Sequence, residues 1–204
     1  MASVVIDGLV LPVSLDGHQV LDFCNTRARW GTPAPKEYLV SHAHLTVWAR
    51  ERGLIPAGEV DRLRRLAVAR PAEAAGVVAR TLRFREALYA VLVGPASAAD
   101  WAGVNLEIGP AGSSVELAAG TPAVWRVTGS GLDLPLRSVA WAAAGFLTTP
   151  AAATVGACPS DICGWLFLNP TGRRRWCSMA WCGNRAKARR HAAKVREVSA
   201  SRAR

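Results

Sequence analysis

Four cysteines in the last third of the chain have the spacing of a metal site. Two C-x₄-C pairs, Cys158 with Cys163 and Cys177 with Cys182, are separated by thirteen residues. Thiolates at this spacing can converge on one ion, and zinc favours tetrahedral coordination by sulfur. Because four protein ligands leave no position for a substrate water, the pattern predicts one structural Zn²⁺ per chain. An iron–sulfur cluster or two disulfides are the alternative uses of the same cysteines.

The positive charge of the chain lies in the same segment. The net charge is +10 at pH 7, of which residues 158–204 carry +9 and residues 1–157 carry +1. Such a surplus indicates an anionic partner, and we expect double-stranded DNA. The alternative is a solvated basic tail that serves solubility. The candidate nucleic-acid-binding residues are Arg173, Arg174, Arg175, Arg185, Lys187, Arg189, Arg190, Lys194 and Arg196.

A helix after Cys182 would carry basic residues on two faces. At about 100° per residue, the two faces comprise Arg185, Arg189 and Arg196 on one side and Lys187, Arg190 and Lys194 on the other. We expect Arg185 and Arg189 to contact bases in the major groove, because Arg can bind guanine bidentately. Residues 173–175 are expected to contact phosphates. Trp165, Trp176 and Trp181 are expected to form a small core of the finger, not platforms for base stacking.

The residues around the cysteines resemble the CGNR zinc-finger family. The naming tetrad is present as Cys182-Gly183-Asn184-Arg185, and Trp-Leu-Phe at 165–167 and Arg-Arg-Trp-Cys-Ser-Met at 174–179 precede it in the expected order. The chain departs from the family at 169–171, where Asn-Pro-Thr replaces the usual acidic residue and Ser/Thr-rich turn. The departure affects the loop and leaves the four cysteines in place.

The N-terminal part is similar to the ABATE domain, which commonly precedes a CGNR finger. Leu-Asp-Phe-Cys-Asn-Thr at 21–26 resembles the Leu-Asp-x-x-Asn-Thr signature of that domain, and Trp48 and the segment 82–88 resemble later parts of it. Together the two resemblances cover nearly the whole chain. They imply a transcription regulator, a role that rests on the domain architecture.

The segments before the cysteines are expected to be mainly helical. Apolar residues recur at helical spacing, and the period changes once to that of strands. The predicted helices span 16–29, 35–52, 56–70, 71–93 and 135–147, and the predicted hairpin pairs 114–117 with 124–127. We therefore predict an α+β chain. A mainly helical domain with a small β-hairpin would span 1–150, and a small zinc finger ending in a basic helix would span 151–204.

A polar cluster in the helical domain is the candidate ligand site, comprising Asp22, Asn25, Thr26 and Arg85. Short polar side chains on an apolar helix are expected to cap or cross-link helices, here through Arg85. Contact with a small-molecule effector is the alternative role. The domain would then sense that ligand or mediate formation of a homodimer.

Several function classes find no support in the sequence. It contains no Gly-rich phosphate loop, no G-x-S-x-G and no H-E-x-x-H motif, and Cys24 has no evident His partner, so we do not expect an enzyme. The N-terminal apolar run is too short for a signal peptide, and Gly and Pro interrupt the uncharged stretch between Arg137 and Asp161, so no membrane partner is expected. We expect a cytoplasmic DNA-binding transcription regulator. The alternative is an RNA- or protein-binding adaptor that uses the finger.

Overall fold

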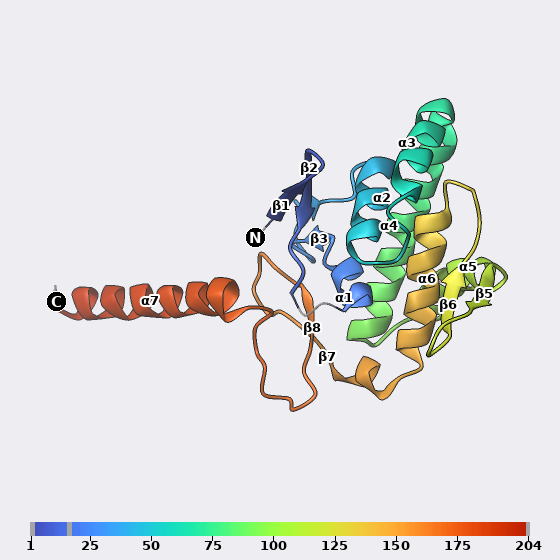
Figure 1. Cartoon of the computed structure of the whole chain (residues 1–204). Helices are drawn as coiled ribbons and strands as arrows, with labels where there is room; N and C mark the ends of the chain where they lie inside the picture. The colour runs from blue at the N-terminus through green and yellow to red at the C-terminus, as the bar shows by residue number, and fades with distance from the viewer. Residues whose placement is uncertain (1–2, 16–17, 203–204) are drawn as a thin grey trace.

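The computed structural model describes residues 3–15 and 18–202 and shows a helical body from which a long C-terminal helix projects (Figure 1). The helices are α1 (Gln19–Cys24), α2 (His42–Glu51), α3 (Glu59–Ala69), α4 (Pro71–Val93), α5 (Ala98–Gly112), α6 (Leu134–Leu147) and α7 (Asn184–Arg202). There are also two short helical turns: a 3₁₀ turn, η1 (Pro150–Thr154), and a π-helical turn, η2 (Met179–Gly183). None of the described helices is both long and apolar enough to cross a membrane.

Four two-stranded antiparallel sheets accompany the helices. The strand pairs are β1 (Ser3–Ile6) with β2 (Leu9–Pro12), β3 (Arg27–Ala28) with β4 (Lys36–Glu37), β5 (Val115–Ala118) with β6 (Val124–Val127), and β7 (Val155–Ala157) with β8 (Leu166–Leu168). The last pair belongs to the finger, in a segment without regular helix that separates the body from α7 (Figure 1). The predicted α+β class, with a mainly helical body and a finger that ends in a helix, is confirmed.

Apolar faces of α1, α2, α4 and α6 form the main core. At its centre the ring of Phe23 lies 5.5 Å from that of Trp48 and 5.7 Å from that of Phe84, centroid to centroid. All three side chains are buried. Helix α4 spans the predicted range, with Pro71 in its first turn and Gly94 after its last residue, the positions that these residues favour at helix ends. Helix α6 and the β5–β6 hairpin also lie close to their predicted positions.

Two predicted helices were too long. The helix predicted at 16–29 covers only 19–24; residues 16 and 17 lie outside the described residues, and Arg27 begins β3. The helix predicted from Pro35 begins at His42, where the side chain of Ser41 caps it. Residues 36 and 37 pair instead with β3, and the Glu37 carboxylate accepts hydrogen bonds from the backbone N–H groups of Tyr38 and Leu39. These bonds hold the segment extended, so the helix cannot start earlier.

The sequence pattern missed helix α5 and the β1–β2 hairpin. Helix α5 contains Gly103, Gly109 and Pro110, residues that disfavour helix, and leaves Trp101 exposed. Gly103 has a packing role, because a Cβ there would lie 3.0 Å from the Cβ of Ala87 in α4. Tertiary packing against α4 therefore stabilises a helix that intrinsic propensity does not predict.

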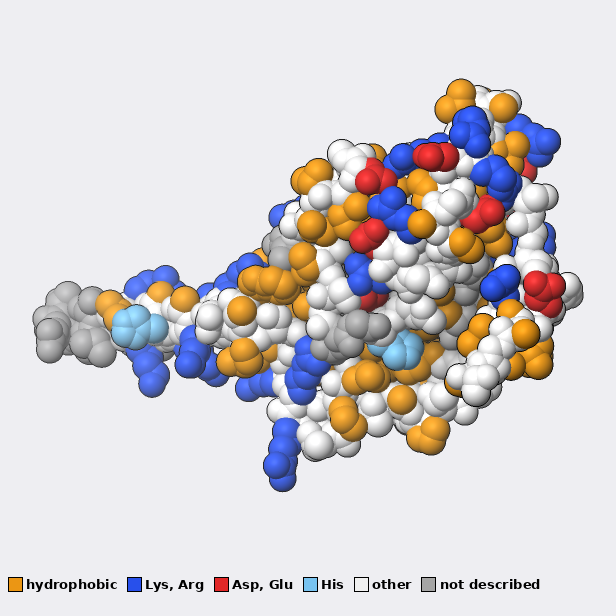
Figure 2. Space-filling view, viewed as in Figure 1, with side chains coloured by type: hydrophobic (Ala, Val, Ile, Leu, Met, Phe, Trp, Pro, Cys, Tyr) orange, Lys and Arg blue, Asp and Glu red, His pale blue; other side chains and the backbone are white. Residues whose placement is uncertain are grey.

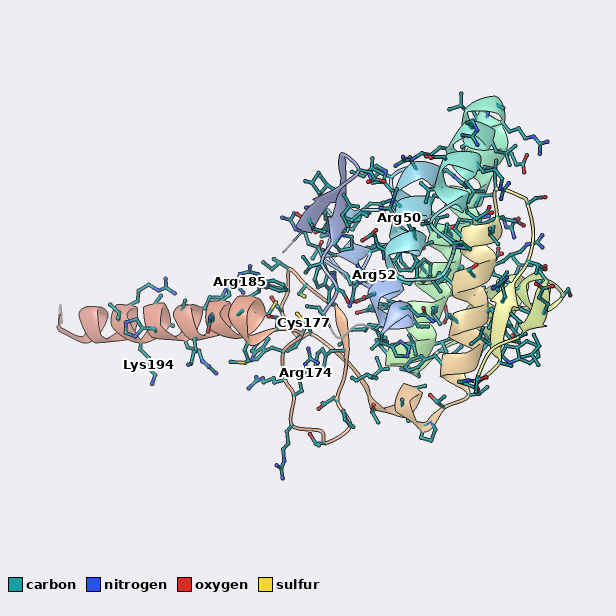
Figure 3. All side chains as sticks on the ribbon, in the orientation of Figure 1. Arg50, Arg52, Arg174, Cys177, Arg185 and Lys194 are labelled. Carbon is teal, nitrogen blue, oxygen red and sulfur yellow. The ribbon has the colours of Figure 1, made fainter. Side chains whose placement is uncertain are left out.

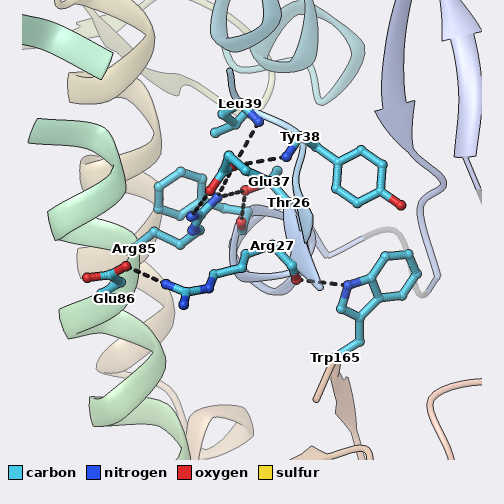
Figure 4. Close-up of polar contacts among 9 residues, drawn as sticks. Thr26, Arg27, Glu37, Tyr38, Leu39, Arg85, Glu86 and Trp165 are labelled. Atoms are coloured by element: carbon cyan, nitrogen blue, oxygen red, sulfur yellow. Dashed lines mark hydrogen bonds and ion pairs between the residues drawn. The ribbon is translucent and has the colours of Figure 1, made fainter. Parts of the chain in front are cut away.

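A buried arginine joins α4 to the extended segment before α2 (Figure 4). Arg85 is fully buried, and its Nη1 donates to Thr26 Oγ1 and to Glu37 Oε1, each at 2.8 Å. Its Nη2 donates to the second oxygen of Glu37. Because both carboxylate oxygens bind the guanidinium, the pair has the bidentate geometry of strong ion pairs. It fixes the position of β4 and Tyr38 relative to α4.

Arg85→Ala is expected to lower the free energy of unfolding by about 3 kcal/mol, since it leaves the Glu37 carboxylate without its cation and opens a cavity in the core. Arg83→Ala is the matched control, because Arg83 lies exposed on the same helix. It should change stability by less than about 0.5 kcal/mol. Urea unfolding measures both, and equal stability of the two variants would contradict the assigned role.

Candidate zinc centre and basic helix

The four cysteines predicted as ligands come together in one buried cluster. The sulfur atoms of Cys158, Cys163, Cys177 and Cys182 all lie within 4.8 Å of one another. Sγ of Cys177 is 3.5 Å from that of Cys163 and 3.6 Å from that of Cys182. Tetrahedral zinc with Zn–S bonds of about 2.3 Å requires sulfurs about 3.8 Å apart. The cluster therefore fits one zinc ion, and its four thiolates fill the coordination sphere of a structural site.

The first two cysteines lie in the loop that joins β7 to β8, and the second two lie beside and within η2. Cys158 follows β7 and its N–H donates to the carbonyl of Trp165, while the N–H of Cys163 donates to Ser160. Between Cys163 and β8 the chain passes Gly164 at φ +71°, where a Cβ would lie 2.6 Å from that of Trp30. Only glycine fits this turn against the body. The second pair is set by η2, in which the N–H groups of Cys182 and Gly183 both donate to Ser178.

The four thiols of the cluster influence one another's ionisation. Hydrogen bonds from Cys163 and Cys177 lower the pKa of the Cys158 thiol to about 2. The same contacts with Cys158 raise the pKa of Cys163 and of Cys177, and burial raises the pKa of Cys182. One thiolate thus suppresses ionisation of its neighbours. A divalent ion would bind all four as thiolates, and its contribution is to order the finger.

The zinc cluster is attached to the body by hydrogen bonds and by a shared core. The Asn25 side chain donates from Nδ2 to the Leu166 carbonyl at 3.0 Å and accepts from the Leu166 N–H at 2.7 Å. The carbonyl of Cys163 accepts from the Arg29 N–H, and Trp165 Nε1 donates to the Arg27 carbonyl. Tyr38 and Ala28 of the body pack in the same apolar cluster as the cysteines, Trp165 and Phe167. Sequence-distant segments therefore hold the finger in one orientation.

Of the three tryptophans expected in the finger core, Trp165 is buried and Trp176 packs partly against the cluster. The expectation was wrong for Trp181, which is 37% exposed. Trp181 lies in the π-helical turn η2, next to the buried ligand Cys182.

The candidate ligand residues in the body all bond to other parts of the chain. Asp22 forms an ion pair with Arg52 at 2.9 Å and accepts from the N–H of Leu15, Asn25 holds Leu166, and Thr26 accepts from Arg85. These contacts agree with the structural role, cross-linking of segments, that we expected for these residues in preference to ligand contact. Contact with an effector at these four residues stays a prediction.

Sequence reasoning missed the partners in these contacts. Glu37, Arg52 and Leu166 are separated from Arg85, Asp22 and Asn25 by 30 to 141 positions. No local pattern marks them, although an acidic residue opposite a buried arginine is expected on electrostatic grounds.

Most of the candidate basic residues are exposed, and two are not. Figure 3 shows Arg185 beside Cys177 at the base of α7 and Lys194 farther along the helix. Arg185 is half-buried there. Arg174 bonds within the finger: its Nε donates to the Trp176 carbonyl, and its guanidinium lies 4.6 Å from the ring centroid of Phe167. The exposed members are Arg173, Arg175, Lys187, Arg189, Arg190, Lys194 and Arg196.

The reduced chain is expected to bind one zinc ion, and Cys177→Ser should lose it, because a hydroxyl is a poor substitute for a thiolate ligand. Cys24→Ala is the control, since Cys24 is buried in the core of the body, apart from the cluster. Elemental analysis after gel filtration measures the metal content. Zinc retained by Cys177→Ser, or lost from Cys24→Ala, would contradict the ligand set.

Asn25→Ala should destabilise the chain by about 2–3 kcal/mol, because it leaves two buried backbone groups of Leu166 without partners. The exposed Asn105→Ala provides the comparison and should have little effect. Thermal unfolding of the zinc-loaded variants measures both. A stability loss that is the same in the two variants would refute the proposed attachment of the finger.

Comparison with known families agrees with this arrangement. Residues 17–150 match the ABATE family model, whose description is "Putative stress-induced transcription regulator", and residues 154–195 match the CGNR zinc-finger model. The two descriptions name a regulator and a zinc finger, not an enzyme. A search of curated proteins finds no match. The first model covers well over half of the chain and the second covers all four cysteines, so the chain belongs to the ABATE family and carries a CGNR zinc finger.

Proposed function

We propose that this zinc-binding regulator acts on transcription by binding double-stranded DNA through the finger and α7. The observation that carries the proposal is the placement of the charge. Figure 2 shows Lys and Arg side chains along α7 on more than one side of the projecting helix, whereas basic and acidic side chains intermingle on the body. A single helix of this kind fits the major groove of DNA.

The base of α7 offers a second basic surface. Arg175, Arg185, Arg189 and Arg190 line a groove of about 310 Å³ together with Trp176. Asp161 also lines this groove and pairs with Arg189 at 3.0 Å. Because both partners are exposed, the pair is weak and DNA phosphates can replace it. The proposal keeps the half-buried Arg185 and the exposed Arg189 as base-contacting residues, and Arg173 and Arg175 as phosphate contacts. Arg174 bonds within the finger and orders the loop that carries Arg173 and Arg175.

The body would regulate this activity by sensing a ligand or by forming a homodimer. Both roles are part of the proposal, as is a cytoplasmic location, which fits a chain whose five cysteines form no disulfide. The exposed Trp181 beside α7 favours one alternative, an adaptor that binds RNA, because an exposed ring can stack on an unpaired base.

Affinity for a fluorescent DNA duplex is expected to fall roughly a thousandfold between 50 and 200 mM KCl, if about six phosphates are neutralised. Changing Lys187, Arg190 and Lys194 together to Ala should remove about three of these contacts and lower the salt slope by nearly three. Fluorescence anisotropy measures both quantities.

The matched control changes three arginines of the body, Arg64, Arg65 and Arg70, to Ala and should leave the slope unchanged. Salt-independent binding, or an equal loss in the two triple variants, would rule out the α7 interface. Tighter binding to single-stranded RNA of the same sequence would favour the adaptor instead.

A further inference from the structure

A cleft on the body runs along one edge of strand β6, which lies between β5 and α6 (Figure 1). Its volume is about 610 Å³, within the range of about 300–1,000 Å³ that ligand sites occupy. Residues 124–129 line it as a consecutive run, whereas no residue of β5 does, and α6 and the loop after α2 form the opposite wall. Because the side chains of a strand alternate between its two faces, a consecutive run indicates that the edge of β6 borders the cleft.

The main-chain groups on this edge of β6 are free to bind another strand. The sheet has two strands, and the N–H of Thr128 donates to the Ser114 carbonyl across it. In an antiparallel pair, hydrogen-bonded and non-hydrogen-bonded positions alternate, so Trp125 and Val127 occupy non-hydrogen-bonded positions. Their N–H and C=O groups point away from β5 and have no hydrogen-bond partner among the described residues. Such an edge is a template for pairing with a further chain.

The side chains of β6 define what the added strand would carry. On the face toward α6, Trp125 is 61% exposed, and its ring meets that of Trp141 edge to face at 6.0 Å. Neighbouring strands place opposed side chains on the same face, so an apolar residue opposite Trp125 would cover its exposed indole. Arg126 lies on the other face, outside the aromatic wall, with Glu116 as its neighbour in β5. An acidic residue opposite Arg126 on the added strand would complement its charge on that outer face.

We propose that this edge of β6 binds an extended peptide segment of a partner protein, which adds a third antiparallel strand and fills the cleft. Along the peptide, an apolar, an acidic and a large apolar residue would face Val127, Arg126 and Trp125. Residues 115–117 of β5 have this order, Val-Glu-Leu, on the opposite edge of the same strand. Main-chain hydrogen bonds would supply affinity, and the side chains would supply specificity. The inference names a ligand class for the ligand-sensing role proposed above and rests on that role.

The test titrates the zinc-loaded chain with a capped peptide that has the sequence of residues 113–119, Ser-Ser-Val-Glu-Leu-Ala-Ala. Backbone amide NMR follows the binding. We expect saturable shifts and slower hydrogen exchange at the amides of Trp125 and Val127, because each N–H gains an acceptor. Shifts at the outer edge of β5, at Val115 and Leu117, in place of these would contradict the assigned edge.

N-methylated peptides distinguish strand addition from non-specific contact. In the proposed register the N–H groups of the peptide Val and Leu face β6, and that of its Glu faces away. N-methylation at the Leu should weaken binding at least about tenfold, whereas N-methylation at the Glu should change it less than about twofold. Replacing the peptide Glu by Lys should weaken binding about threefold. Equal effects of the two N-methyl groups would overturn the proposal.

Trp125→Ala should weaken binding of the peptide about tenfold, because its apolar side chain loses the indole against which it packs. Trp101→Ala is the control, since Trp101 is exposed and lies outside the cleft lining. Absence of saturable shifts, or an equal loss in the two variants, would overturn the proposal. Protection of the Trp125 and Val127 amides that grows with protein concentration without peptide would assign the edge to a second copy of the chain instead. The measurement contains no DNA, so its failure is distinct from failure of the DNA-binding proposal.

Discussion

Four buried thiols within a few ångströms of one another cannot all ionise unless a cation lies between them, and the C-terminal part of this chain depends on that constraint. Hydrogen bonds from Cys163 and Cys177 lower the pKa of the Cys158 thiol, and the same contacts raise the pKa of Cys163 and of Cys177. A zinc ion removes the conflict and links the loop between β7 and β8 to η2. Because α7 follows η2 without a break, the ion also fixes the point from which the basic helix projects.

The body and the finger are joined by polar contacts that a hydrophobic interface alone would not specify. Asn25 pairs with both backbone groups of Leu166 in the finger, and Trp165 Nε1 donates to the Arg27 carbonyl. Within the body, Arg85 pairs in the same way with both oxygens of Glu37. Buried polar groups without partners are costly, so each of these pairs defines one register between distant segments. The finger thereby has a fixed orientation, in which Asn25 at the end of α1 holds β8.

The sequence predicted what depends on local pattern and missed what depends on distant contacts. The cysteine spacing identified the zinc cluster, and helical periodicity with Pro71 and Gly94 at the ends located α4. Helix α5 escaped prediction because its Gly and Pro residues favour loops, and packing against other helices, including the close approach of Gly103 to Ala87 of α4, stabilises it. The sequence could not predict the cleft that Trp125 of β6 and Trp141 of α6 line, because it exists only where these two distant segments meet.

The central claim is that zinc orders the finger so that α7 can bind DNA. The most direct measurement compares duplex binding by the zinc-loaded chain and by the same chain reduced and stripped of metal, at one salt concentration. The account predicts that affinity falls at least about tenfold without zinc, as expected when a binding element loses its fixed orientation, and returns with one equivalent of the ion. Equal affinity of the two forms would contradict it.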